Sequence, residues 1–401
     1  MRVLFWSGEA VLGGAERSLL DLVASLRAHD PRLELELLLG AAGPLGERAA
    51  LEGAGVRVLP LPDGLASLGD SGARGLGATL ARGVLALPSG LAYAREARRA
   101  LLEHGPDLVH TNSLKTHLLA AALVGDRVPV VWHMRDFPGE RALASRLLAL
   151  VAGRASACVA ISEAVRADLL RVCPSLPTRV VLNAIDLERF SPEGPRLDLD
   201  AQAGLPPAEP GAARVGVVAG FGRWKGQDLF LQALARLPQG APPWRGYVVG
   251  GPLYRTEGSQ FSREELVQLS RGLGLADRVG FVPFQLDAAP VLRALDVVVH
   301  PSTRPEPFGR TIAEGMATGR AVIASAAGGS LELFEDGVEA LGVEPGDATQ
   351  LASALAALLA DPGRRDALGR SARARARVSF DRARLGPEMA AVYARVLAGR
   401  S

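Results

Sequence analysis

Two glutamates stand eight positions apart in the stretch RPEPFGRTIAEGMATG, residues 304–319. Prolines flank Glu306 on both sides, and a residue before proline is pushed out of the helical region, which places this carboxylate on a stiff, extended turn. Glu314 falls inside the helical pattern that follows. The first amides of that helix, expected from about Gly309, have no partners within the helix and form an anion site suited to phosphate.

The stretch therefore offers a fixed carboxylate, a phosphate site and, in Glu314, an acceptor for the two hydroxyls of a vicinal diol. A nucleotide sugar presents a sugar, a diphosphate and a ribose in that order. The alternative left open by these residue types is a surface loop, with a solvated Glu306 and a capping or salt-bridged Glu314.

Short apolar runs alternate with helical patterns along the chain, which predicts the α/β class with parallel sheets. We expect helices between the strands and helices alone after residue 325. The expected strands are 2–7, 33–39, 107–111, 128–133, 157–162 and 179–184, one run around VRVLPL, and then 214–221, 246–251, 278–284, 296–302 and 321–325.

Residues 189–213 are rich in proline, glycine and alanine, which is typical of a linker. We therefore expect an N-terminal domain over 1–188, a C-terminal domain over 214–378, and a last helix over 379–401 that could pack back toward the N-terminal domain. Each domain should carry its own sheet. A cleft between two such domains is the default place for a ligand.

The composition excludes several classes of protein. The formal net charge is +2, so charge gives no reason to expect nucleic acid as a partner. Cys158 and Cys173 are too few for a disulfide framework, which favours a reducing, cytoplasmic compartment. We find no signal peptide pattern and no run of about 18 apolar residues. Only two of the 45 basic residues are lysines, Lys115 and Lys225, which marks both as candidates for specific roles.

Four segments together resemble the retaining glycosyltransferases of the GT-B fold, family 4 (glycosyltransferase group 1). HPSTRPEPFGRTIAEGMATGRAVIAS (300–325) resembles the donor motif of that family, with its two glutamates. The other three are GFGRWKGQDLFLQALARL (220–237), NAIDLERFSP (183–192) and GGAERSLLDL (13–22). The resemblance covers nearly the whole chain and implies two Rossmann-like domains facing a cleft.

The resemblance also implies roles for individual residues. Glu306 would contact the donor sugar near its reacting carbon, and His133 would hydrogen-bond a sugar hydroxyl. Glu314 would hold the ribose. The remaining implied contacts are the amides of Phe308, Gly309, Arg310 and Thr311 to sugar and phosphates, Arg223 and Lys225 to the diphosphate, and the N-terminal glycine loop of Gly13 and Gly14 to phosphate or acceptor.

Other polar residues are open to two interpretations. His110 and Lys115 could line the cleft or serve the local structure. We expect His117 on a helix surface and Glu16 orienting the start of the first helix. The base of the nucleotide would be held through the backbone around 279–284.

No metal and no cofactor are predicted, because helix amides with Arg223 and Lys225 can neutralise a diphosphate. The one D-x-D pair, Asp198 and Asp200, falls in the expected linker, where we interpret it as a solvated charge pair.

A basic face over 72–102 could rest on anionic lipid, although a solvated face is the more common reason for such a pattern. Its basic residues are Arg74, Arg82, Arg95, Arg98 and Arg99.

The expected reaction is metal-independent transfer of a sugar, with retention, from a UDP- or GDP-linked donor to a glycan, lipid-linked or small-molecule acceptor. Cell-envelope polysaccharide is the expected pathway class, with a cytoplasmic enzyme that could touch the inner face of the membrane. Two alternatives stay open: another GT-B enzyme, such as a phosphorylase or a sugar-nucleotide epimerase, and a non-catalytic protein that binds nucleotide sugars.

Overall fold

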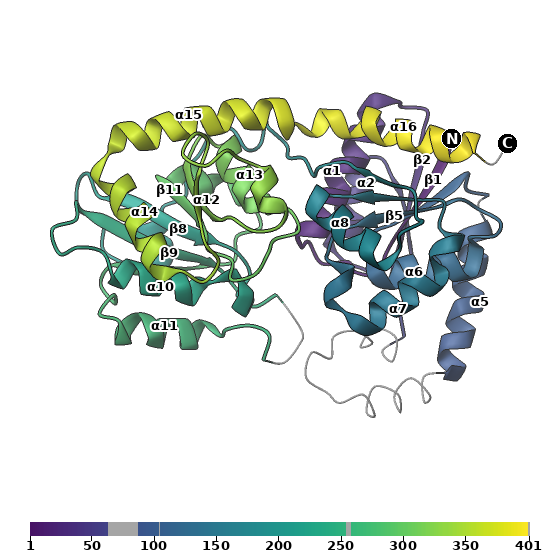
Figure 1. Cartoon of the computed structure of the whole chain (residues 1–401), viewed down its shortest axis with the longest axis horizontal. Helices are drawn as coiled ribbons and strands as arrows, with labels where there is room; N and C mark the ends of the chain where they lie inside the picture. Colours follow the sequence, from purple (N-terminus) through teal and green to yellow (C-terminus); the bar gives the residue numbers. More distant parts are fainter. Residues whose placement is uncertain (63–86, 104, 254–257, 400–401) are drawn as a thin grey trace. The chain divides into compact units, whose positions relative to one another are not determined.

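The computed structural model of the 401-residue chain describes residues 1–62, 87–103, 105–253 and 258–399. The chain divides into two units (Figure 1). The first comprises Met1–Ala184 with Arg382–Ser401, and the second comprises Ile185–Asp381.

The first unit contains a seven-stranded, all-parallel sheet in the order β3-β2-β1-β4-β5-β6-β7. The strands are β1 (Arg2–Ser7), β2 (Glu34–Leu39), β3 (Gly55–Val58), β4 (Leu108–Thr111), β5 (Val130–Met134), β6 (Ala157–Ala160) and β7 (Thr178–Val180). The helices are α1 (Gly14–His29), α2 (Pro44–Leu51), α5 (Leu87–Glu103), α6 (Leu114–Val124), α7 (Ala142–Val151), α8 (Glu163–Val172) and α16 (Leu385–Ala398).

The C-terminal helix α16 belongs to the first unit, where it packs against α1 (Figure 1). Gly386 allows the close approach, since a Cβ there would lie 2.4 Å from the carbonyl oxygen of Ser25. Met389 and Tyr393 from α16 join a buried apolar cluster with Phe5 of the sheet. Helix α16 thus helps to cover one face of the first sheet.

The second unit contains a six-stranded, all-parallel sheet in the order β10-β9-β8-β11-β12-β13. The strands are β8 (Ala213–Val218), β9 (Trp244–Gly250), β10 (Val279–Pro283), β11 (Val297–His300), β12 (Ala321–Ser325) and β13 (Leu341–Val343). The helices are α9 (Leu199–Ala203), α10 (Gln227–Ala235), α11 (Arg263–Gly272), α12 (Ala289–Ala294), α13 (Arg310–Ala317), α14 (Ala348–Ala360) and α15 (Pro362–Ser379). One face is covered by α10, α11 and α14, and the other by α13 and α15 (Figure 1).

Two parallel α/β units are therefore confirmed, but two parts of the expected organisation differ. Residues 189–213 are not a linker: they belong to the second unit and contain α9, which packs against β10. Buried Leu199 and Asp200 hold that helix in place. The sequence does not indicate this, because the composition around the helix is rich in proline. The strand β13 is also absent from the sequence prediction, because it is only three residues long.

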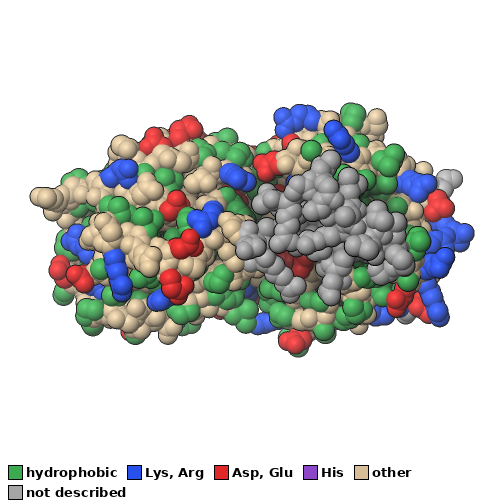
Figure 2. All heavy atoms as spheres, turned by 90° about the horizontal axis from the view of Figure 1, so that it is seen from below, with side chains coloured by type: hydrophobic (Ala, Val, Ile, Leu, Met, Phe, Trp, Pro, Cys, Tyr) green, Lys and Arg blue, Asp and Glu red, His purple; other side chains and the backbone are tan. Residues whose placement is uncertain are grey.

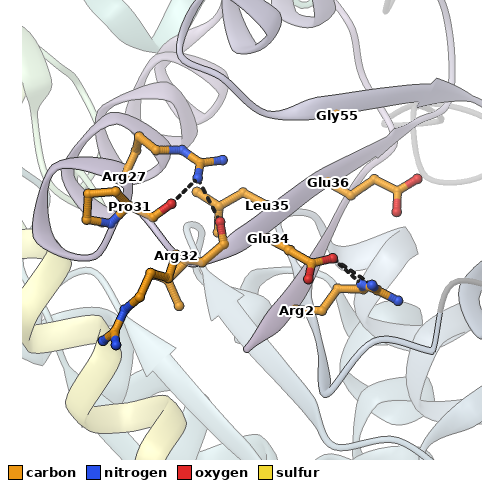
Figure 3. A pocket seen from close by; sticks show the side chains of 9 residues that line it. Arg2, Arg27, Pro31, Arg32, Glu34, Leu35, Glu36 and Gly55 are labelled. Atoms are coloured by element: carbon orange, nitrogen blue, oxygen red, sulfur yellow. Dashed lines mark hydrogen bonds and ion pairs between the residues drawn. The ribbon is translucent and has the colours of Figure 1, made fainter.

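Each sheet reverses its strand order once, between β1 and β4 in the first unit and between β8 and β11 in the second. In open parallel sheets, ligands bind beyond the carboxyl ends of the strands at such a reversal. A pocket of about 430 Å³ in the first unit lies instead at the amino ends of β1 and β2. Figure 3 shows Arg2 pointing toward Glu34 and Arg27 toward the backbone of Pro31, so these two cations of the pocket already have protein partners.

Candidate active site

Glu306 lies in the loop between β11 and α13, and backbone hydrogen bonds hold this loop firmly. Its amide donates to the carbonyl of Ala327 at 3.1 Å, and its own carbonyl accepts from the amide of Gly329 at 2.7 Å. Gly328 adopts φ 70°, and a Cβ there would lie 2.6 Å from the carbonyl oxygen of Glu306. The flanking prolines and this clamp fix a carboxylate that is only 6% exposed.

Lys225 reaches Glu306 from the turn after β8. Its Nζ lies 2.6 Å from Glu306 Oε1, and Ser302 also donates to that oxygen. Gly226 makes the approach possible: it adopts φ +71°, and a Cβ there would lie 1.9 Å from the carbonyl oxygen of Pro301. The lysine and the carboxylate thus stand in the segments that follow β8 and β11, the two strands that flank the reversal of the second sheet.

The charge state of this cluster follows from its burial and its partners. Burial raises the pKa of Glu306, but the Lys225 ammonium, His300 and two hydrogen bonds outweigh burial and hold this pKa at about 2. Burial also lowers the pKa of His300 to about 4, so the imidazole is neutral beside a charged carboxylate 3.8 Å away. At neutral pH the site holds one ion pair and a neutral histidine.

Helix α13 begins directly after this loop. Gly309 caps it with φ 96°, and Thr311 Oγ1 donates to the carbonyl of Val218, the last residue of β8, at 3.3 Å. Glu314 is 7% exposed and accepts from Arg310 Nε at 3.2 Å. The start of α13 therefore lies at the carboxyl end of the sheet, with a second carboxylate–cation pair on its first turns.

One of the side chains predicted to contact the donor, Arg223, has another partner in the structure. Arg223 bonds Glu265 on α11 at 2.9 Å and lies over the ring of Phe261 at 4.3 Å. The Phe308 side chain is buried and packs edge-to-face on Phe380, which leaves only its backbone for a ligand. The structure thus pairs Lys225 with Glu306 and Arg310 with Glu314, whereas Arg223 pairs with Glu265.

In the first unit, polar side chains meet beyond the carboxyl ends of β4, β5 and β7. Arg135 donates to Asn112 Oδ1 at 2.5 Å, to Asn183 Oδ1 at 3.0 Å and to His133 Nδ1 at 3.2 Å. Asn112 also bonds the carbonyl of Ala15 at 3.4 Å, next to the glycine loop. His133 itself is 3% exposed, and its Nε2 is buried with no hydrogen-bond partner among the described residues.

His117 lies elsewhere than expected, and His110 follows the structural one of its two interpretations. His117 is not on a helix surface: it is 1% exposed, stacks on Trp132 and bonds Thr111 Oγ1 at 2.6 Å. His110 lines no surface either, because it is fully buried between Tyr393 and His133. His110 lies on β4, a short parallel strand whose residues are all buried, and His117 lies on the buried face of α6 against Trp132 of β5.

Gly13 precedes α1 and Gly14 begins it. Glu16 folds back over this turn, with its Oε2 2.8 Å from where a Gly13 Cβ would stand. Burial raises the pKa of Glu16 against the opposing effect of backbone hydrogen bonds and of Arg135. Lys115 lies half-buried in the first turn of α6.

The D-x-D pair is not a solvated charge pair. Asp198 caps α9 by accepting from the amide of Ala201 at 3.0 Å. Asp200 is 5% exposed and accepts from Tyr247 at 2.6 Å, from Arg214 at 3.1 Å and from Arg245 at 3.2 Å. These donors occupy the Asp200 carboxylate, whose role is to hold α9 to the sheet.

The basic face expected over 72–102 is described only in part, since Arg74 and Arg82 lie outside the described residues. Of the rest, Arg98 donates to the carbonyl of Leu123, Arg99 pairs with Glu103, and Arg95 is exposed. Figure 2 shows acidic and basic side chains interspersed on the faces of the two units that it presents. Within the described residues, no helix combines the length and the apolarity needed to cross a membrane.

Solved structures with the same fold include HepE of Anabaena in complex with UDP. That protein is 26% identical, with a TM-score of 0.79 over 98% of this chain and 100% of its own. HepE with UDP-glucose gives a TM-score of 0.78 at the same identity, over 98% of this chain and 99% of its own. The fold of this chain is therefore the GT-B fold.

Family models agree with the structural comparison on both units. The model described as glycosyl transferases group 1 matches residues 207–375, and that of glycosyltransferase family 4 matches 12–189. The chain belongs to the group 1 glycosyltransferases.

Curated relatives include two glycosyltransferases of about one-third identity. The lipopolysaccharide core biosynthesis mannosyltransferase LpsB of Rhizobium meliloti is 34% identical over 54% of this chain. The D-inositol 3-phosphate glycosyltransferase of Salinispora tropica is 36% identical over 58% of this chain. The matched regions span 61% and 50% of the length of these two relatives.

Sequence reasoning missed several residues of these clusters, among them Arg135, Asn112 and Asn183. His300 and Ser302 directly precede the Glu306 loop, and their position at the end of a strand was a usable signal. Tyr393 had no such signal, because it contacts His110 across 283 positions of sequence.

Proposed function

We propose that this chain transfers a sugar from a nucleotide-diphosphate sugar to an acceptor hydroxyl, with retention of anomeric configuration and without a metal ion. The observation that carries the proposal is the Lys225–Glu306 pair beside the start of α13. A partly buried ammonium, a fixed carboxylate and a helix start converge beyond the strands β8 and β11, where ligands of open parallel sheets bind.

The proposed mechanism uses these groups as fixed charges. As the glycosidic bond breaks, the leaving diphosphate gains negative charge, and Lys225 with the first amides of α13 stabilises it more in the transition state than in the ground state. Glu306 remains ionised at neutral pH, since its pKa is about 2. It therefore serves as an anion near the electron-poor sugar carbon and not as a proton donor.

The remaining donor contacts follow the sequence analysis. Glu314 would accept from the ribose hydroxyls, exchanging its bond with Arg310 for the ligand, and Arg310 would then be released toward the phosphates. Arg223 would have to leave Glu265 to take part, and both side chains are about half exposed, so this exchange costs little. His133 would donate to a sugar hydroxyl.

A UDP-linked donor is the first choice, with a GDP-linked donor second, because HepE was crystallised with UDP and with UDP-glucose. For the acceptor we propose a glycan or lipid-linked hydroxyl of the cell envelope, supported by the name of the Rhizobium relative. Two free, buried cysteines fit a cytoplasmic enzyme, with the acceptor reached at the inner face of the membrane.

The test is to incubate the protein with UDP-glucose and GDP-mannose, each with a panel of simple glycosides, with and without EDTA. The anomeric configuration of the product is then read by proton NMR. We expect an α-linked product from an α-linked donor, formed equally well with the chelator present. A β-linked product would contradict retention, and loss of activity with EDTA would contradict metal independence.

A further inference from the structure

Three buried side chains form a hydrogen-bonded row from α16 to β5 within the first unit. Tyr393 Oη lies 2.8 Å from His110 Nδ1, and His110 Nε2 lies 3.0 Å from His133 Nδ1. All three residues are at most 3% exposed. The row ends at His133 Nε2, which is buried and has no hydrogen-bond partner within the described part of the chain.

Arg135 decides where the protons of this row lie. A guanidinium can only donate, so His133 Nδ1, 3.2 Å from Arg135 NH2, must be an acceptor. The contact from His110 Nε2 to the same atom then requires that His110 carries its proton on Nε2. Its Nδ1 is left with a lone pair, which accepts from the Tyr393 hydroxyl.

The electrostatics agree with neutral rings. Burial lowers the pKa values of His110 and His133 well below 6.5, and Arg135 lowers both further. His117, on α6, also disfavours a charge on either ring. Tyr393 keeps its proton, because burial raises its pKa well above 10. A neutral His133 with an accepting Nδ1 has its only proton on Nε2.

We infer that Tyr393 and His110 are positioning residues that, with Arg135, lock His133 into the tautomer with Nε2–H. The unpartnered Nε2 of His133 is then a buried, preoriented hydrogen-bond donor for an oxygen acceptor such as a sugar hydroxyl. The protonation pattern stands on the geometry of the first unit. Its use in sugar transfer rests on the proposed function.

The positions of the protons along this row have a chemical consequence. His133 cannot accept a proton from an acceptor hydroxyl at Nε2, because that nitrogen has no free lone pair in this tautomer. The residue thus orients the sugar and does not act as a general base. The C-terminal helix, remote in sequence from both histidines, contributes the hydroxyl that completes this arrangement.

The experiment is long-range proton–nitrogen NMR on the full chain labelled with ¹⁵N-histidine, which has six histidines to assign. It compares the wild type with Tyr393→Phe, and with Tyr93→Phe as the control for loss of another buried tyrosine hydroxyl in the same unit. Calorimetry with UDP and steady-state kinetics with the UDP-sugar accompany the spectra.

In the wild type we expect both His110 and His133 with the proton on Nε2, unchanged between pH 6 and pH 8. In Tyr393→Phe we expect a second tautomer of His110. The KM for the sugar donor should rise about tenfold with the Kd for UDP unchanged, because only the hydrogen bond from His133 to the sugar is weakened. Tyr93→Phe should change neither.

A wild-type His133 protonated on Nδ1, or on both nitrogens at neutral pH, would overturn the inference. Unchanged tautomers and an unchanged KM in a folded Tyr393→Phe protein would overturn the role of Tyr393. The wild-type spectra decide the protonation pattern even if the variant does not fold. The same spectra decide the protonation pattern even if the protein transfers no sugar. Failure of the proposed function can therefore be told apart from failure of this inference.

Discussion

Lys225 and Glu306 form an ion pair in which each residue makes the burial of the other tolerable. Their side chains are 19% and 8% exposed. Removing one partner of such a pair leaves an uncompensated buried charge, which costs about 3–5 kcal/mol. A variant at either position therefore changes stability and chemistry together, and the two effects have to be separated.

We expect Lys225→Met to lower kcat by about 10²–10³-fold, the loss typical when a fixed group that stabilises developing negative charge is removed. The same variant should weaken UDP binding and lower the free energy of unfolding. Steady-state kinetics and urea unfolding measure these quantities.

The control is the double variant Lys225→Met with Glu306→Gln. The double variant has no unpaired charge at this site. It should therefore recover most of the free energy of unfolding that Lys225→Met loses, while activity stays absent. Activity restored together with stability would mean that Lys225 acts only through folding.

At the scale of the elements, the turn from Gly222 to Gly226 decides where the lysine stands. We expect Gly226→Ala to lower stability by more than about 2 kcal/mol and kcat/KM by at least tenfold, because the added Cβ would meet Pro301 and push the turn away from Glu306.

Gly274→Ala is the matched variant, since Gly274 has φ +74° but nothing within 4 Å of its added Cβ. It should cost only the backbone strain of about 1 kcal/mol and leave kcat unchanged. Equal losses in the two variants would show that the approach to Pro301 is unimportant.

The helix α9 offers a second comparison, within the pair Asp198 and Asp200. Asp200→Ala should destabilise the protein by about 3 kcal/mol, because it leaves the buried hydroxyl of Tyr247 and two arginines without their acceptor. Asp198→Ala loses only a helix cap, worth about 1 kcal/mol.

Thermal unfolding with and without added Mn²⁺ measures both variants. We expect neither the wild type nor Asp200→Ala to gain stability from the metal. A rise in Tm for the wild type that is lost in Asp200→Ala would contradict the structural role of Asp200 and indicate a metal site.

The elements show where sequence reasoning reaches its limit. Parallel strands buried on both faces appear as apolar runs, so β1, β4, β8 and β11 could be predicted from the sequence. The three-residue β13 and the helix α9 could not, because neither has a periodic apolar pattern of its own. Glu306 was predictable from its prolines, whereas its bond to Lys225 depends on the close packing at Gly226.

The same limit applies to buried polar residues of the first sheet and of α6, the helix that packs on β4 and β5. His110 and His117 have the residue type of surface or ligand groups, and nothing local reveals that Tyr393 and Trp132 enclose them. Contacts over long sequence separations, such as that from α16 to β4, need the fold before they can be recognised.

At the scale of the whole molecule, buried neutral histidines make the two units differ in their response to acid. The pKa is lowered well below 6.5 for His110 and His133, to about 3 for His117 and, in the second unit, to about 4 for His300. Below pH 6.5 the unfolded chain binds protons that the folded chain does not, so stability falls as the pH falls.

Each such histidine costs about 1.4 kcal/mol per pH unit below 6.5, until its folded pKa is reached. Among the described residues, the first unit has three such histidines and the second unit has one. The first unit should therefore lose stability more steeply between pH 6.5 and pH 5. Glu306 adds to the loss in the second unit only below about pH 4.5, because its folded pKa is about 2.

Hydrogen exchange followed by mass spectrometry at pH 7 and pH 5, corrected for the intrinsic exchange rate, measures this difference. Protection should fall more for peptides from β4 and β5 than for those from β8 and β11. An equal fall in both units would contradict the assignment of three buried neutral histidines to the first unit.

We propose above that the second unit binds a nucleotide diphosphate through Lys225, without metal. The direct test is calorimetric titration of wild type and Lys225→Met with UDP and GDP, with and without EDTA. We predict binding of one nucleotide by the wild type, unaffected by the chelator and weakened at least tenfold in the variant. Absence of binding by either nucleotide, or equal binding by the variant, would contradict the account.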